Sequence, residues 1–417
     1  MDPVPLVTGA EGAPRSYKLM EIPPELESIL SAGTDSPLLT FNGRLVDEAV
    51  LSTTNKTYAV RQVHQSNSLL LCAVEQSGDG GMYLRLHQNV ADTIELVPTP
   101  PRLGRIVALL HDSEYAGEEA EMDAAFARLY TPNEVRSVIQ ASEEELAQGL
   151  RDEHVLVLDG YTRRVATSFL HELLRVVLNQ LDILACDAEH VPYAPVLEAL
   201  QMSARAEVAE KMLCDWFCAA PRPTGVPTHV ALATADIARF IGVYLLSTEK
   251  RMALLDFLAR WKEALGPLAD EAQLPLLTGN YLFYPPPASF TTVNAHQAGH
   301  TEPMPETLAS GIAIQYFPRE HLPLAPAQCL QELFMLRTQW VREEITPFIA
   351  HLLSAAPGSK KNAGLDGLLL KHGRSCKARW SRVHAAVLLR AGLLDSAGAP
   401  PATGTEECTL YQARVKY

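Results

Sequence analysis

Residues Tyr130–Arg164 read YTPNEVRSVIQASEEELAQGLRDEHVLVLDGYTRR, and this stretch decides the fold of the second half of the chain. It contains two helix-start signals a few residues apart. Thr131 and Glu134 form a capping box around Pro132, which is favoured at the first helical position because its missing N–H is not needed there. The SEEE at 142–145 is a second such box, with carboxylates where the helix dipole favours them. The sequence therefore predicts two short helices in succession.

A β-hairpin is predicted to follow the two helices. Residues 154–158 are apolar and β-branched, which favours a strand, and Asp159–Gly160 is a strong hairpin turn before a returning strand at 161–165. The order helix, helix, strand, turn, strand is typical of a winged-helix module, which binds nucleic acid or protein and rarely performs catalysis. The alternative is an ordinary helical hairpin beside a strand.

The composition is that of a globular protein with several domains. The chain has 417 residues, of which 47% are hydrophobic and 20% charged. This length suggests roughly two to four domains with sizeable cores. No long apolar window predicts a membrane span, and the N-terminus lacks the basic region of a secretory signal. The seven cysteines are scattered, so free thiols in a reducing compartment, cytoplasm or nucleus, are expected.

Charge is distributed unevenly along the chain. The formal net charge of −14 argues against a protein coated in nucleic acid. Residues 112–153 hold twelve acids and three basic residues, whereas residues 359–390 hold one acid, Asp366, and eight basic residues. A local basic surface near the C-terminus is therefore expected on an acidic protein. Its members are Lys360, Lys361, Lys371, Arg374, Lys377, Arg379, Arg382 and Arg390.

The first 110 residues are predicted to be rich in strands. Turn-forming sequences separate the candidate strands, and helix signals are nearly absent. The run Leu69–Val74, LLLCAV, is apolar on both strand faces, so both faces need a cover. We expect a partner chain to complete the sheet; a self-sufficient small barrel is the alternative. The candidate strands are 17–22, 37–41, 49–52, 57–63, 68–74, 82–86 and 93–97.

The expected fold class is α+β, with an N-terminal β-barrel-like domain that partner subunits complete, followed by tandem winged-helix domains. The theme of a helix pair and then a strand recurs after residue 165. A long Pro-rich loop at 285–310 and a wing strand at 382–389 are also expected. The predicted domains are 1–110, a β-barrel partner-binding domain; 111–129, a linker; 130–248 and 249–338, the first and second winged-helix regions; and 339–417, a third winged-helix domain.

Sequence patterns typical of catalysis are absent. The chain has no GxxxxGK[ST], GxSxG or HExxH motif. Cys214 and Cys218 are one helical turn apart but lack two further zinc ligands, so we interpret them as core thiols. His296 and His300 lie in a glycine-containing loop without a third ligand. We therefore expect no enzyme, no metal and no cofactor; an enzyme with a pocket between the two halves is a remote alternative.

Three segments together resemble the sister-chromatid cohesion Dcc family, a non-ATPase subunit of the alternative (chromosome transmission fidelity) replication factor C clamp loader. They are STTNKTYAVRQVHQSNSLLLC at 52–72, YTPNEVRSVIQASEEELAQGL at 130–150 and LFMLRTQWVREEITPFIAHLL at 333–353, in the family's order. The chain departs from the family in its Pro-rich loop and in its Ala- and Pro-rich tail after Leu394.

The resemblance implies a nuclear adaptor. Its N-terminal half would share a β-barrel with a small partner subunit and with the C-terminal tail of the large clamp-loader subunit. Its C-terminal half would carry tandem winged helices that touch single- and double-stranded DNA. The assembly would dock on the catalytic subunit of DNA polymerase epsilon, and the complex would load or unload the sliding clamp, PCNA.

We predict DNA contacts without sequence preference, since counterion release rather than base edges would drive binding. The alternatives are a solvated basic face, pairing with the acidic 112–153 segment, and a winged-helix scaffold that binds protein only. The predicted partner-binding residues are Leu69, Leu70, Leu71 and Val74. The predicted DNA-binding residues are Lys360, Lys361, Lys371, Arg374, Lys377, Arg379 and Arg382, with Arg163 and Arg164 on the first wing.

Overall fold

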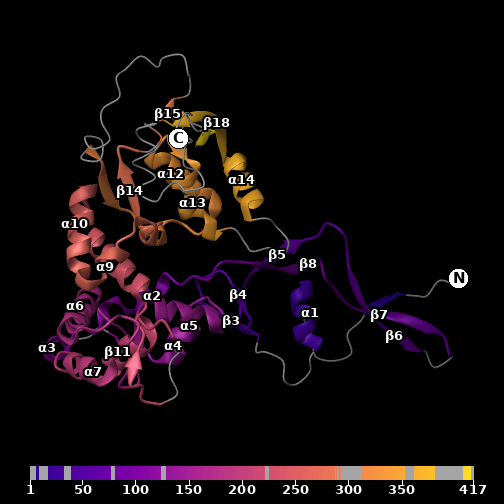
Figure 1. Ribbon diagram of the computed structural model, residues 1–417. Coiled ribbons are helices and arrows are strands. Elements are labelled where there is room, and N and C mark those ends of the chain that lie inside the picture. The colour runs from indigo at the N-terminus through magenta and orange to yellow at the C-terminus, as the bar shows by residue number, and fades with distance from the viewer. Residues whose placement is uncertain are drawn as a thin grey trace. The chain divides into compact units, whose positions relative to one another are not determined.

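The computed structural model contains both helices and sheets, as the predicted α+β class requires (Figure 1). Contacts divide the chain into two compact units. Unit 1 comprises 1–106 and 131–149, and unit 2 comprises 107–130 and 150–417. The structure describes residues 6–8, 17–31, 39–76, 80–123, 128–220, 225–286, 288, 291–292, 311–352, 361–380 and 407–414.

Unit 1 contains two open sheets. One has the strand order β2-β8-β5-β4-β3 and the other the order β1-β7-β6. The described strands do not close into a barrel, so the predicted barrel is not confirmed, although every strand predicted in this part is present. The strands are β1 (Leu6–Thr8), β2 (Leu19–Glu21), β3 (Thr40–Asn42), β4 (Val50–Ser52), β5 (Thr57–His64), β6 (Leu70–Gln76), β7 (Met82–Asn89) and β8 (Asp92–Pro98).

Unit 1 also contains a helix that the sequence analysis did not predict, α1 (Pro24–Ser31). It begins with a proline and has Glu25 and Glu27 in its first turn, both of which favour a helix N-terminus. Leu26 of α1 is 1% exposed and packs in the core of the five-stranded sheet. That core also contains Leu51, Tyr58 and Leu96.

The two helices predicted after Tyr130 are present as α4 (Pro132–Val138) and α5 (Glu143–Asp152). Each starts at its capping box: the Thr131 N–H donates to the Glu134 carboxylate over 2.8 Å, and the Ser142 N–H donates to Glu145 over 2.9 Å. Residues 131–149 nevertheless belong to unit 1. The stretch predicted to be one winged helix is thus divided between the two units, and its winged-helix character is not confirmed.

Buried polar contacts explain why the helix pair belongs with the β-sheet. The Gln140 side chain is completely buried, and its Nε2 donates to the carbonyls of Asn42 (3.2 Å) and Glu48 (2.7 Å). The Thr57 hydroxyl of β5 donates to the Glu145 carboxylate over 2.5 Å. These bonds join residues that are more than eighty positions apart in the chain, which local sequence signals do not reveal.

Unit 2 begins with short helices and the predicted hairpin. Asp159 and Gly160 both have positive φ, 51° and 84°, as a tight hairpin turn with the right twist requires. The elements here are α2 (Arg105–Leu110), α3 (Glu118–Asp123), β9 (Val155–Leu158) and β10 (Tyr161–Arg164). Those that follow are α6 (Thr167–Leu184), β11 (Val191–Pro192), α7 (Tyr193–Gln201), α8 (Ala206–Lys211), β12 (His229–Val230), α9 (Thr234–Glu249) and α10 (Leu254–Leu265).

The rest of unit 2 is built around two sheets, with strand orders β13-β16-β14 and β15-β18-β19-β17. On β14, Tyr281 and Phe283 pack in the larger core, whereas Leu282 between them packs in a second core with α12 and α13. The elements are β13 (Arg251–Ala253), β14 (Tyr281–Tyr284), β15 (Thr291–Thr292), β16 (Ala313–Tyr316), α12 (Pro326–Leu336), β17 (Gln339–Val341), α13 (Arg342–Ile349), α14 (Lys361–His372), β18 (Gly373–Trp380) and β19 (Glu407–Ala413).

Two predictions for this region lie largely or wholly outside the described residues. They are the wing strand at 382–389 and most of the Pro-rich loop at 285–310. The predicted domain boundaries stay predictions.

Candidate interaction surfaces

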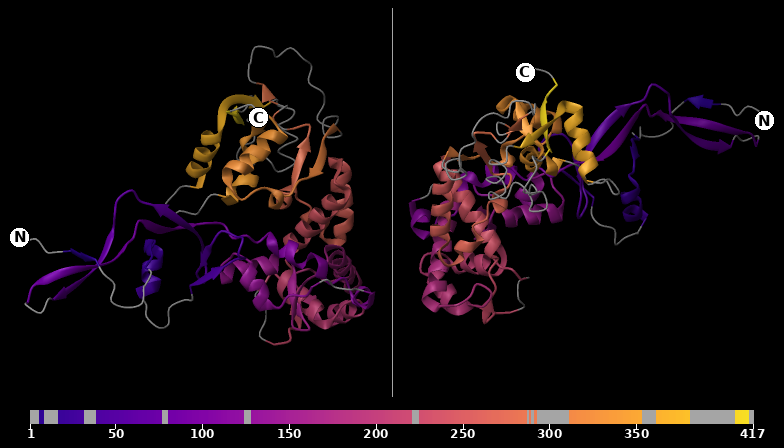
Figure 2. Two further views of the ribbon diagram at one scale, coloured as in Figure 1. Left: turned by 180° about the vertical axis from the view of Figure 1, so that it is seen from behind. Right: turned by 45° about the horizontal axis from the view of Figure 1, so that its top comes forward.

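The predicted partner-binding residues lie on an exposed edge strand of unit 1. β6 pairs only with β7 in its sheet, and its other edge has no neighbour among the described strands. No residue of β6 or β7 is fully buried. In both views of Figure 2 the ribbon of β6 and β7 extends away from α1. Leu69, Leu70, Leu71 and Val74 are 47%, 44%, 38% and 63% exposed.

A polar cluster fixes the end of this ribbon. Glu75 of β6 accepts hydrogen bonds from the Tyr83 hydroxyl (2.6 Å) and the Arg85 guanidinium (2.9 Å) of β7. Both hydrogen bonds lower the pKa of the Glu75 carboxyl from its ordinary value, and the bond from Tyr83 has the larger effect. The ribbon therefore keeps its register while its apolar side chains stay in solvent.

The predicted basic surface is only partly described. Lys371 at the end of α14, and Arg374 and Lys377 on β18, are exposed. Arg374 and Lys377 are three positions apart on a strand, so they point to opposite faces of the sheet. Lys361 lies at the start of α14 and Arg379 near the end of β18, whereas Lys360 and Arg382 lie outside the described residues.

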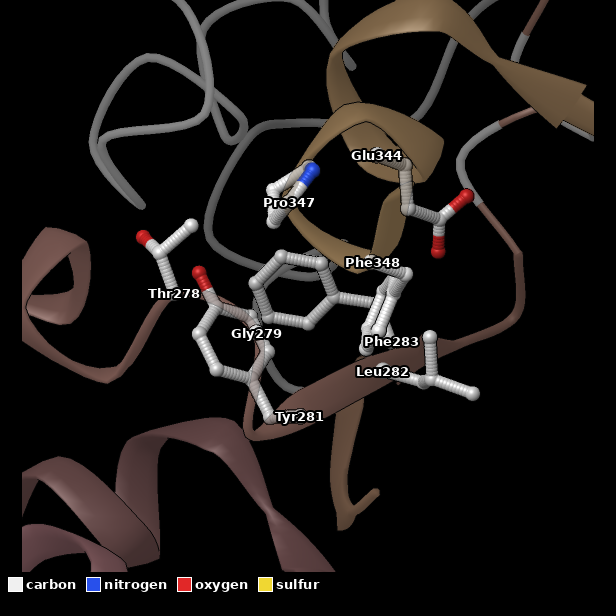
Figure 3. Close-up of a pocket in the computed structure, with 8 residues that line it drawn as sticks. All are labelled: Thr278, Gly279, Tyr281, Leu282, Phe283, Glu344, Pro347 and Phe348. Atoms are coloured by element: carbon white, nitrogen blue, oxygen red, sulfur yellow. The ribbon is translucent and has the colours of Figure 1, made fainter. Parts of the chain in front are cut away.

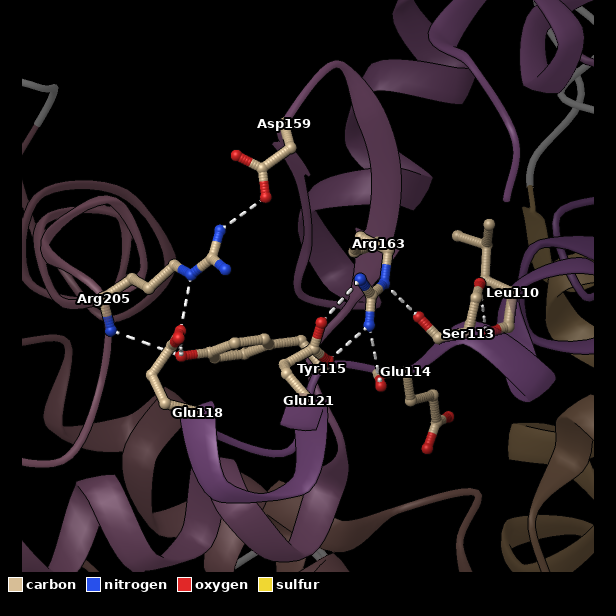
Figure 4. A network of polar contacts seen from close by, with 9 residues as sticks. All are labelled: Leu110, Ser113, Glu114, Tyr115, Glu118, Glu121, Asp159, Arg163 and Arg205. Carbon is tan, nitrogen blue, oxygen red and sulfur yellow. Dashed lines mark hydrogen bonds and ion pairs between the residues drawn. The ribbon is translucent and has the colours of Figure 1, made fainter. Parts of the chain in front are cut away.

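Arg163 and Arg164, predicted on the first wing, have acidic partners within the chain, and Figure 4 shows those of Arg163. Arg163 is 5% exposed, and its guanidinium donates to the Glu121 carboxylate over 2.7 Å and to the carbonyls of Ser113 and Glu114. Arg164 forms ion pairs with Glu114 and Glu153. The side chains of both residues therefore pair with acids of the 112–153 segment, as one of the alternatives describes, and their contact with DNA stays a prediction.

The tip of the same hairpin is also held by an ion pair. Arg205 forms ion pairs with Asp159 in the turn, over 2.7 Å, and with Glu118 of α3, while its backbone N–H donates to the Tyr115 hydroxyl (Figure 4). Burial raises the pKa of Tyr115 to about 12, so this hydroxyl stays protonated. Ion pairs with other residues of unit 2 therefore hold the β9–β10 hairpin both at its turn and along β10.

A small pocket in unit 2 is lined by three aromatic residues, Tyr281, Phe283 and Phe348, and by five others (Figure 3). Glu344 is one of its lining residues and forms a buried ion pair with Arg337, which also donates to the Phe283 carbonyl. Burial raises the pKa of the Glu344 carboxyl to about 7, against the opposing effect of Arg337. Arg337, which directly follows α12, is thereby bonded to Glu344 of α13 and to Phe283 of β14. The lining residues are Thr278, Gly279, Tyr281, Leu282, Phe283, Glu344, Pro347 and Phe348.

The described residues show neither a metal site nor a helix suited to span a membrane. They contain no cluster of three or more His, Cys, Asp or Glu side chains that could hold a metal ion. In the same part of the chain no helix is long and apolar enough to cross a membrane.

Sequence analysis missed one exposed apolar pair, Leu45 and Val46, in the connection between β3 and β4. The available signal was the presence of two aliphatic residues in the middle of a turn, where polar residues and glycine are preferred.

The described residues thus include an exposed apolar edge strand and exposed basic side chains, features typical of proteins that bind other macromolecules. The family model of sister chromatid cohesion protein Dcc1 matches residues 17–349. The chain therefore belongs to the Dcc1 family, and the resemblance found in the sequence is confirmed.

Curated relatives from distant eukaryotes support the family. The chain is 26% identical to sister chromatid cohesion protein DCC1 of Xenopus tropicalis over 374 residues, 86% of each protein. It is 25% identical to the Homo sapiens protein over 388 residues, 90% of each. It is 23% identical to the Saccharomyces cerevisiae protein over 387 residues, 86% of this chain and 93% of that protein. These names refer to cohesion and to no enzymatic activity.

The family match covers one of the two candidate surfaces and not the other. The β6 ribbon lies within residues 17–349, whereas the basic residues from Lys360 onward lie beyond the matched range.

Proposed function

We propose that the chain is a non-catalytic adaptor and DNA-binding subunit of an alternative clamp-loader complex. This complex would load or unload the sliding clamp at replication forks in the nucleus, support sister-chromatid cohesion and dock on DNA polymerase epsilon. The observation that carries the proposal is the exposed apolar edge strand β6.

The physics of edge strands supports the adaptor role. An unpaired strand edge presents a row of backbone N–H and C=O groups that can pair with a strand from another chain. On β6 those groups stand beside four exposed apolar side chains, Leu69, Leu70, Leu71 and Val74. A partner strand would therefore gain backbone hydrogen bonds and apolar burial together. The small partner subunit and the large-subunit tail are the proposed occupants.

Assembly of the full chain tests this role. We would co-express it with the small subunit and the large-subunit tail, as wild type, as Val74→Glu, and as Met202→Glu. Both positions are exposed, at 63% and 84%, but Met202 lies in unit 2. Val74→Glu should leave the chain folded and abolish co-purification, because a carboxylate would be buried against the added strand. Unchanged assembly of Val74→Glu would contradict the proposal.

The DNA-binding part of the proposal rests on Lys371, Arg374 and Lys377, which are exposed and basic. Reversal of all three to Glu should weaken binding to a 30-nucleotide duplex and flatten its dependence on salt, because fewer counterions are released. Lys262→Glu, at an exposed position of α10, is the matched control.

The second candidate function is a scaffold that binds protein only. The ion pairs of Arg163 and Arg164 support it, since these two side chains already have acidic partners within the chain. Under this alternative the triple reversal would leave DNA affinity unchanged and disturb assembly.

A further inference from the structure

The connection between β3 and β4 displays two aliphatic side chains fully to solvent. Leu45 and Val46 are 107% and 92% exposed relative to a free residue. They occupy the two central positions of a four-residue turn. The Asp47 N–H donates to the Arg44 carbonyl over 3.0 Å, and the Arg44 N–H donates to the Asp47 carboxylate over 2.9 Å.

Hydrogen bonds and an ion pair with other residues of unit 1 hold this turn in place. The Asp47 carboxylate accepts two bonds of 2.5 Å from the Arg105 guanidinium, and this partner lowers the pKa of Asp47 well below its usual range. The Gly43 N–H donates to the Ser137 carbonyl over 3.3 Å. Gln140 bonds the backbone on both sides of the turn. The two aliphatic side chains are therefore presented by a fixed support and do not belong to a loose loop.

The residues at the turn centre contradict local preference. Asn, Asp, Gly and Pro favour such positions, whereas a β-branched valine is among the least suited. A hydrophobic side chain in full contact with water gains nothing for the fold. Residues that are unfavourable in their local structure, and that form no compensating contact within the protein, indicate a functional site.

We propose that Leu45 and Val46 form a docking anchor that inserts into an apolar pocket, with a carboxylate on its rim, on a folded protein partner. The charges around the turn explain why a carboxylate is expected on the rim of the partner's pocket. Asp47 and Glu48 are engaged in ion pairs with Arg105 and Arg102. Arg44 is exposed and has no ion pair within the described part of the chain. The anchor therefore presents two apolar groups beside one cation.

Two other occupants fit the anchor less well. A second copy of this chain would have to offer an apolar pocket with a free carboxylate, and in the pocket of the described residues Glu344 is already paired with Arg337. Membrane binding is marginal even for a whole acyl chain, so these two side chains would not hold the protein on a lipid surface. A preformed pocket on a protein that also touches this chain elsewhere fits an anchor of this size. The inference rests on the geometry of the turn and goes beyond the clamp-loader assignment.

The first part of the test identifies the pocket. The full chain is expressed in dividing cells with the photo-reactive residue benzoyl-phenylalanine in place of Leu45, or in place of Met202 as an exposed control. The proposal expects one protein adduct specific to position 45, mapped to an apolar pocket that contains a carboxylate. Adducts identical to those of the control, a self-adduct or a lipid adduct would overturn it.

The second part measures affinity with that purified partner. Leu45→Asn with Val46→Gly should weaken binding by about a hundred- to ten-thousandfold, the loss expected for two fully buried aliphatic groups. The melting temperature should stay the same or rise, because these residues suit the turn. Arg44→Glu should also weaken binding, and carboxylate→Lys in the partner pocket should restore it. Unchanged affinity, or a loss that charge exchange does not restore, would refute the anchor.

Discussion

Arg163→Met is the change that best separates a structural arginine from a DNA contact. Arg163 lies on β10, where the sequence predicts a wing that touches phosphate. Its side chain is 6% exposed, and that of its partner Glu121 is 17% exposed. Methionine keeps much of the length and apolar volume of the arginine but removes every donor. The Glu121 carboxylate would lose two hydrogen bonds, and the carbonyls of Ser113 and Glu114 would lose one each.

The size of the effect follows from burial. Removing one member of a buried ion pair costs roughly 3–5 kcal/mol, because the remaining charge stays without a partner. Glu121 retains some contact with water, which compensates part of this cost, so we expect about 3 kcal/mol at the lower end. For a unit of this size that loss corresponds to a melting temperature lower by roughly 6–8 °C. Arg163→Lys should lower the free energy of unfolding by less than Arg163→Met, because lysine keeps the positive charge. Some loss remains, since one ammonium replaces a guanidinium that bonds several acceptors.

Calorimetry of the full chain measures the unfolding of unit 2, and a duplex titration at several salt concentrations measures phosphate contacts. Arg163→Met should lower the melting temperature and leave the salt slope unchanged. Exposed Lys262→Met is the control and should change neither. The reasoning is refuted if Arg163→Met melts within about 1 °C of wild type and reduces the salt slope by about one unit.

Three further predictions concern the fold. Gly43→Ala should destabilise unit 1 by about 1–3 kcal/mol in denaturant titrations, since Gly43 has a φ of +134° and its Cβ would lie 2.6 Å from a neighbouring amide nitrogen; Gly104→Ala, which meets nothing within 4 Å, is the neutral control. Burial raises the pKa of Glu344 from 4.5 to about 7, so its contribution to stability is present below pH 4.5 and lost as the pH rises through 7. Thermal melts from pH 4.5 to 8 should show this fall, and Glu344→Gln should flatten it; an unchanged slope would contradict the assignment. A fragment of residues 1–149 should fold more stably than 1–110, which lacks the helix pair; equal protection of both against proteolysis would argue that the helices are dispensable.

Local signals predicted much of the secondary structure because those signals are themselves local. The capping box at Thr131 and Glu134 and the turn at Asp159–Gly160 each involve residues within four positions of one another. The strands of the first 110 residues follow from alternation and turn chemistry in the same way. Helix α1 was missed because its N-terminal proline and acids are a short signal inside a strand-rich region.

The tertiary assignment of these elements depended on contacts that no local pattern contains. Gln140 lies between two predicted helices and looks like an ordinary polar linker residue. In the structure it is completely buried and bonds two carbonyls more than ninety positions earlier. That contact places the helix pair in unit 1, whereas the order of elements along the chain predicted a winged helix with the hairpin that follows.

The same limit applies when charged binding residues are predicted from the sequence. Sequence identifies a basic residue, but only the fold decides whether an acid of the same chain has already neutralised it. Arg163 and Arg164 meet acids up to fifty positions away, so their charges are paired within the chain. Apolar residues behave in the opposite way. The run at Leu69–Val74 was predicted to need a cover. None of the described residues buries it, and its exposure argues for a partner. Exposure against expectation is therefore the stronger indication of a binding surface here. The β6 ribbon and the turn at Leu45–Val46 both meet that criterion, and the arginines of the hairpin do not.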